Sequence, residues 1–179
     1  MNDFHLGHSG VGSWHNSLLY DRAEEMVRET VELLNKKSLD SIVVLGDLTN
    51  DGSDSQLALA HDILDELIAP WIVIPGNHDR EAVKTGRFTD VFGDHFPGLS
   101  REVLGVYSLF LPEYLPPGEH PRTELGSDLI ERVVQVAGRC TSHNLFVFSH
   151  FPLITQADYA RDHNAKYAKH YLDGETLLS

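Results

Sequence analysis

The side chains that could bind metal ions stand directly after short apolar segments of this sequence. Asp47 follows one such segment, Asn77 and His78 follow a second, and His150 follows a third. Carboxylate, imidazole and amide groups without a thiolate suit Mn, Fe, Zn, Co or Ni better than Ca or a structural zinc site. The sequence therefore predicts a transition-metal site, provided that the fold brings these positions together.

A further pair of ligand-type residues stands near the start of the chain. Asp3 and His5 are two positions apart, so their side chains would share one side of an extended segment. Such a pair is common by chance, and Gly46-Asp47 alone is typical of an ordinary turn. The run Gly76-Asn77-His78-Asp79 is more informative, because consecutive ligand-capable residues after a buried strand are a poor way to build a plain turn.

The elements that must position these residues alternate between strand and helix. Apolar runs rich in β-branched residues predict buried strands over 41–45, 71–74 and 144–148. Apolar residues at helical spacing predict helices over 22–37, 53–68 and 125–138. A short helix and loop are expected over 87–99, a strand or hairpin over 103–111, a surface loop over 112–121, and weak helix from about 158.

This order favours an α/β fold, in which helices cover the faces of a parallel sheet. The carboxyl ends of parallel strands share one edge, and ligands bind there. We therefore expect the candidate ligands to meet at that edge: Asp3, His5, Asp47, Asn77, His78 and His150.

Composition limits the partners of the protein. The 179 residues fit one domain, 1–179, and carry 14 Lys and Arg against 27 Asp and Glu, a formal charge of −13. Such a negative surface repels phosphate backbones and anionic lipids, so we expect neither nucleic acid nor membrane as a partner. Bound divalent cations would invert the local charge and admit a small anionic substrate.

Targeting and thiol chemistry are also limited. The first ten residues lack a secretory pattern and no apolar run could span a bilayer, so we expect a cytoplasmic protein. Cys140 is the single cysteine, which excludes an internal disulfide and a multi-thiolate zinc site.

Four segments, in this order, resemble the successive motifs of the calcineurin-like metallophosphoesterases. They are Asp3-Phe4-His5-Leu6-Gly7, Gly46-Asp47-Leu48-Thr49-Asn50-Asp51-Gly52, Pro75-Gly76-Asn77-His78-Asp79 and Ser149-His150-Phe151-Pro152. The resemblance is greater to the bacterial cyclic-nucleotide phosphodiesterase branch than to the protein phosphatases. It implies a layered α/β sandwich and a metal-dependent hydrolase of phosphate esters, above all a phosphodiesterase acting on a cyclic nucleotide or another small phosphodiester.

The resemblance also implies how two divalent ions (Mn, Fe or Zn) would be held. Asp3 and His5 would bind the first ion, Asn77 and His150 would bind the second, and Asp47 would bridge the two.

The catalytic roles implied by the resemblance belong to the turn after the second strand. His78 would face the substrate, and Asp79 would orient its ring. A hydroxide bridging two cations about 3.5–4 Å apart would attack phosphorus in line. His78 would then donate a proton to the leaving oxygen.

The sequence departs from the family pattern at both ends. The family continues to a Gly-His-x-His motif that completes both metals, whereas this chain stops at Ser179, and only Met1 and Asn2 precede Asp3. We therefore expect a truncated domain, incomplete at both ends, that binds metal weakly and associates with other copies through exposed sheet edges. Replacement ligands on a helical face bearing His163, Tyr167 and His170 are an alternative, although a solvated helix face is the favoured interpretation of these residues. The alternative function is a catalytically impaired scaffold or binding protein of the same fold.

Overall fold

A computed structural model describes residues 1–7, 20–98, 100–103, 106–111, 127–139 and 145–151. The chain divides into two compact units, residues 1–97 and 98–179. The expected single domain over 1–179 stays a prediction, and the two units are described in turn.

The first unit is built on two parallel strands, β1 (Ile42–Val44) and β2 (Trp71–Val73). Ile42 lies opposite Trp71 in the register, and both strands are largely buried, as their β-branched and aromatic side chains favour. The predicted strands over 41–45 and 71–74 are therefore confirmed.

The N-terminal segment Met1–Leu6 runs beside β1 and the loop that follows it. The N–H of Asp3 donates to the carbonyl of Gly46 and that of His5 to the carbonyl of Asp47, both at 3.0 Å. Leu6 forms a parallel bridge with Thr49. These bonds bring the first and second sequence motifs side by side.

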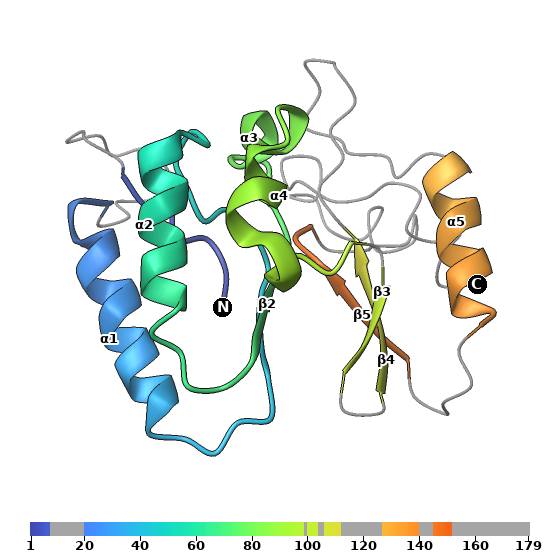
Figure 1. The fold of residues 1–179 in the computed structure, drawn as a ribbon, viewed down its shortest axis with the longest axis horizontal. Helices are drawn as coiled ribbons and strands as arrows, with labels where there is room; N and C mark the ends of the chain where they lie inside the picture. The colour runs from blue at the N-terminus through green and yellow to red at the C-terminus, as the bar shows by residue number, and fades with distance from the viewer. Residues whose placement is uncertain (8–19, 99, 104–105, 112–126, 140–144, 152–179) are drawn as a thin grey trace, which may run out of the picture. The chain divides into compact units, whose positions relative to one another are not determined.

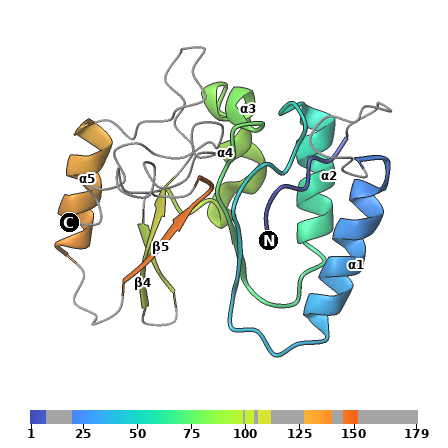
Figure 2. The ribbon, with the colours of Figure 1, turned by 180° about the vertical axis from the view of Figure 1, so that it is seen from behind.

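Helices complete this unit. α1 (Ala23–Asn35) follows the 3₁₀ turn η1 (Tyr20–Arg22), and α2 (Asp54–Leu64) lies beside α1 in both views (Figures 1 and 2). After β2 come α3 (Arg80–Lys84), α4 (Arg87–Phe92) and the 3₁₀ turn η2 (Gly93–His95). The core between them is apolar and includes Leu6, Val31, Leu48, Leu57, Ile63, Val73 and Phe88.

The helix predicted over 53–68 is shorter than expected. α2 ends at Leu64, because the chain turns there through i→i+3 backbone bonds from Glu66 to Ile63 and from Leu67 to Leu64. Leu67 is nevertheless buried, so the apolar pattern continues beyond the end of the helix. The helix predicted over 22–37 is confirmed as α1.

In the second unit, β3 (Ser100–Val103) and β4 (Val106–Leu111) pair antiparallel, which confirms the hairpin alternative for this region. β5 (Leu145–Ser149) pairs with β4 in parallel, and α5 (Ser127–Ala137) confirms the third predicted helix.

The strand predicted over 144–148 is present as β5, but the prediction that it is buried is wrong. Leu145, Phe146 and Val147 are 41–53% exposed. Within the described residues β5 is an end strand of the order β3-β4-β5, so it lacks the second neighbour that covers a central parallel strand.

Two expectations concern parts of the chain outside the described residues, namely the loop over 112–121 and the region from 158, with His163 and His170. Among the described helices, none is long and apolar enough to cross a lipid bilayer.

Ile63 in α2 and Ile68, beyond the end of this helix, should contribute very differently to stability. Ile63 is fully buried and Ile68 is 80% exposed. We expect Ile63→Ala to lower the free energy of unfolding by about 2–5 kcal/mol through lost apolar contact and a residual cavity. Ile68→Ala should change it by less than about 0.5 kcal/mol. Urea unfolding of both variants measures this, and equal midpoints would contradict the assigned packing.

Candidate metal centre

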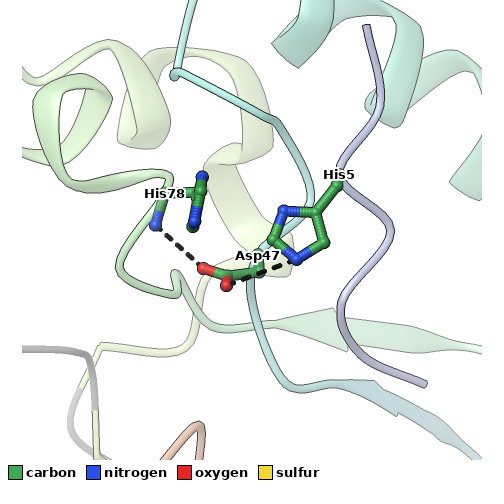
Figure 3. Close-up of side chains that lie close together, drawn as sticks. All are labelled: His5, Asp47 and His78. Carbon is green, nitrogen blue, oxygen red and sulfur yellow. Dashed lines mark hydrogen bonds and ion pairs between the residues drawn. The ribbon is translucent and has the colours of Figure 1, made fainter. Parts of the chain in front are cut away.

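Asp47 lies at the centre of a cluster formed by three separate segments of the chain. It follows β1, and the residue is only 4% exposed. Its Oδ1 accepts a hydrogen bond from the backbone N–H of His78 at 2.8 Å, and its Oδ2 lies 3.7 Å from Nε2 of His5. Figure 3 shows the carboxylate between these two residues.

The N-terminal segment supplies two further groups to this cluster. Nε2 of His5 lies 3.8 Å from Oδ1 of Asp3, so this one ring nitrogen is close to oxygens of two carboxylates. His5 is buried, whereas Asp3 is half exposed. The predicted proximity of Asp3, His5 and Asp47 is therefore present in the structure.

The conformation that achieves this proximity is not the predicted one. Asp3, His5 and Asp47 have φ angles of 58°, 48° and 52°, in the left-handed region rather than the extended one. This conformation costs roughly 1–3 kcal/mol for a residue other than glycine, and it persists where surrounding bonds enforce it. The backbone bonds between the N-terminal segment and the loop after β1 provide that constraint. Strain concentrated on three ligand-type residues is typical of a functional site.

His78 approaches the cluster from the turn after β2. Its ring lies edge-on to that of His5, with centroids 4.6 Å apart. Its Nδ1 is 2.7 Å from the carbonyl oxygen of Asn50, and a carbonyl can only accept, so Nδ1 carries the hydrogen. This bond leaves Nε2 as the ring atom available for chemistry.

Asp79 has a different role from the one expected. Its Oδ1 accepts bonds from the N–H and the hydroxyl of Thr49, at 3.0 and 2.8 Å. Its Oδ2 accepts from the N–H groups of Leu48 and Gly76, at 3.2 and 2.9 Å. The carboxylate thus ties the loop after β1 to the turn after β2. The prediction that Asp79 orients the ring of His78 does not match these contacts, because Asn50 holds the ring.

The electrostatic setting of Asp79 follows from its complete burial. Burial raises the pKa of the Asp79 carboxyl above its ordinary value, and the nearby Asp47 acts in the same direction. The donors of Gly76 and Thr49 act in the opposite direction and lower it. Only the ionised form can accept from all of these groups at once, so the contacts favour a carboxylate.

Two glycines allow these loops to approach each other. A Cβ at Gly76 would clash with the backbone and carboxylate of Asp47, and a Cβ at Gly46 would clash with the backbone of Gly76. Gly46 also has a φ of +91°, which other residues rarely adopt. Close contact between the loop after β1 and the turn after β2 therefore explains why positions 46 and 76 are glycines.

Two predicted ligands remain, Asn77 and His150. Asn77 is half-buried in the turn after β2. On either side of it, the N–H of Gly76 donates to Asp79 and the N–H of His78 donates to Asp47. His150 directly follows β5 in the second unit. Its convergence with the cluster stays a prediction.

The donor set fits a divalent transition-metal ion. Ligand atoms of His5, Asp47 and His78 lie within 4.8 Å of one another. Metal–ligand bonds of about 2.0–2.2 Å place two ligands of one ion at most roughly 4.3 Å apart. The distances of 3.7 and 3.8 Å from His5 to the two carboxylates fall within this limit. Imidazole and carboxylate together suit Zn, Mn or Fe.

Contributors that the sequence did not indicate are the backbone carbonyl of Asn50 and the side chain of Gln56. A carbonyl leaves no trace in residue type. Gln56 could have been found as a polar residue at helical spacing with Ala60 and Ile63, on the face that α2 buries.

We expect Asp79→Asn to destabilise the metal-free protein by about 2–6 kcal/mol. The amide NH₂ would replace one acceptor oxygen and leave two buried donors unpaired, at roughly 1–3 kcal/mol each. Urea unfolding in the presence of a chelator measures the loss. Asp62→Asn, at an exposed position of α2, is the matched control and should have no effect. A variant of Asp79 as stable as that control would show that the carboxylate does not hold the two loops together.

Comparison with known proteins shows the family of the chain. One relative is a protein of Synechococcus sp. named as a probable cyclic nucleotide phosphodiesterase, 29% identical over 124 residues. The aligned region covers 68% of this chain and 46% of the relative, so the chain spans about half the length of that protein. The family model for calcineurin-like phosphoesterases matches residues 1–174. The chain therefore belongs to the calcineurin-like phosphoesterase family.

Proposed function

We propose that this protein is a metal-dependent phosphodiesterase that hydrolyses small phosphodiesters, with a cyclic nucleotide as the first candidate substrate. The family supports a phosphoesterase, and the name of the cyanobacterial relative suggests the phosphodiester class. The observation that carries the proposal is the cluster of the buried His5 and Asp47 with the half-buried His78, assembled from three segments far apart in the sequence.

We propose different roles for the candidate metal ligands. Asp3, His5 and Asp47 are proposed to hold one divalent ion, and Asn77 and His150 are proposed to complete a second site that shares Asp47. When bound, the two ions would supply positive charge to the phosphate and generate a nucleophile from water. The chain is strongly acidic, with a formal charge of −13, so this local positive charge is needed to admit an anionic ester.

His78 is proposed as the proton donor to the leaving oxygen. Its Nδ1–H is held by the carbonyl of Asn50, so in the imidazolium form Nε2–H is directed away from that bond and is free to donate. The backbone N–H of the same residue binds Asp47, which fixes the distance between the donor and the metal-binding carboxylate.

Metal removal is the first test. We expect hydrolysis of bis(p-nitrophenyl) phosphate to require added Mn²⁺ and to disappear in EDTA. Asp47→Ala should lower turnover by at least roughly 100-fold and reduce bound metal, because even groups that only support ligands are worth 10- to 100-fold. Asp62→Asn again serves as the control. Undiminished turnover in EDTA, with metal content measured as nil, would rule out the proposed mechanism. Tight metal binding without hydrolysis of any phosphodiester tested would favour the scaffold alternative.

A second test separates proton donation from metal binding at His78. We expect His78→Ala to lower kcat by about 10²–10⁴-fold on an ester with a poor leaving group, such as cyclic AMP. The loss should be smaller on bis(p-nitrophenyl) phosphate, since p-nitrophenolate leaves without a proton. Metal content, measured by mass spectrometry, should be unchanged. Equal losses on both substrates together with lost metal would reassign His78 as a ligand.

A further inference from the structure

A buried glutamine outside the motifs contacts the loop that holds His78. Gln56 is 8% exposed and is a polar residue among the apolar side chains that α2 buries. Its Oε1 accepts from the backbone N–H groups of Asn50, at 2.9 Å, and Asp51, at 3.1 Å. Its Nε2 makes a longer contact of 3.5 Å with the carbonyl of Gly7, in the first motif.

The contact with Asp51 reaches His78 through a single peptide unit. The N–H of Asp51 and the carbonyl of Asn50 belong to the same planar peptide and point in opposite directions. On one side this peptide donates to Gln56, and on the other its carbonyl accepts from Nδ1 of His78 at 2.7 Å. Holding the N–H of a rigid plane fixes the direction of its carbonyl, and hydrogen bonds in such a chain strengthen one another.

We propose that Gln56 is a positioning residue for His78. By fixing the peptide between Asn50 and Asp51, it keeps the hydrogen of the neutral ring on Nδ1 and aims Nε2 at the reacting phosphate. The catalytic part of this inference rests on the proposed function, whereas the positioning of the ring does not. Gln56 itself touches neither the metal ligands' side chains nor the substrate in this scheme.

The chain offers a control in a second side-chain amide, the half-buried Asn35, that bonds two backbone groups. Asn35 at the end of α1 also bonds two backbone groups of a loop: its Nδ2 donates to the carbonyl of Glu66, and its Oδ1 accepts from the N–H of Ile68, both at 2.8 Å. This loop carries none of the candidate site residues. Asn35→Leu therefore removes a comparable pair of bonds without altering the support of His78.

The test compares Gln56→Met, Gln56→Glu and Asn35→Leu with the wild type. Methionine keeps the length of the side chain but removes the acceptor, whereas glutamate keeps an oxygen that can accept from both N–H groups. The first readout uses ¹⁵N-histidine NMR of the metal-free protein, at a pH where the ring is neutral. The wild type should show His78 protonated on Nδ1, Gln56→Met should shift it towards Nε2, and Gln56→Glu and Asn35→Leu should not.

The second readout is turnover of cyclic AMP by the metal-loaded protein. Gln56→Met should lower kcat by roughly 10-fold with KM and metal content unchanged, as is typical of groups that orient a catalytic residue. Gln56→Glu should restore most of the rate, and Asn35→Leu should retain it although it also loses two bonds to a loop backbone. Equal loss in Asn35→Leu, or an unshifted His78 tautomer in Gln56→Met, would overturn the inference.

Two outcomes keep this inference separate from the proposed function. If neither the wild type nor any variant hydrolyses cyclic AMP, the proposed function fails. The NMR comparison then still decides whether Gln56 positions His78. If Gln56→Met does not fold, measurements on the wild type alone decide whether Gln56 positions His78. The N–H of Asp51 must then be protected from hydrogen exchange and His78 must carry its hydrogen on Nδ1, and the absence of either would refute the inference.

Discussion

The carboxylate of Asp79 is the contact on which the rest of the site depends. It joins the loop after β1 to the turn after β2 through bonds to Leu48, Thr49 and Gly76. Because the glycines at positions 46 and 76 let the two backbones meet, this single buried group sets the distance between Asp47 and His78. A charge without solvent is costly unless donors surround it, so the loops cannot separate without exposing an unpaired carboxylate or its donors.

Around this junction backbone groups hold the side chains of Asp47 and His78. Asp47 is bonded by the N–H of His78, the ring of His78 by the carbonyl of Asn50, and the peptide of Asn50 by Gln56. Backbone hydrogen bonds between Met1–Leu6 and the loop after β1 hold Asp3, His5 and Asp47 in place. These bonds explain why the three residues keep left-handed φ angles despite the strain.

Periodicity and strand-end position were sufficient to predict much of the first unit. The strands ending before Asp47 and Asn77 were correctly placed, and with them the proximity of His5, Asp47 and His78. The parts that failed depend on tertiary contacts that residue type does not reveal. The left-handed angles at Asp3 and His5 come from pairing with the loop after β1, and the true partner of His78 is a carbonyl. The exposure of β5 depends on its neighbours in the sheet and not on its apolar sequence.

We propose that Asp47 and His5 share a metal ion. An anomalous-difference map from crystals grown with Mn²⁺ measures this directly. We expect a peak at about 2.0–2.2 Å from both a carboxylate oxygen of Asp47 and Nε2 of His5. Manganese bound elsewhere, with these two side chains contacting only each other and His78, would contradict it.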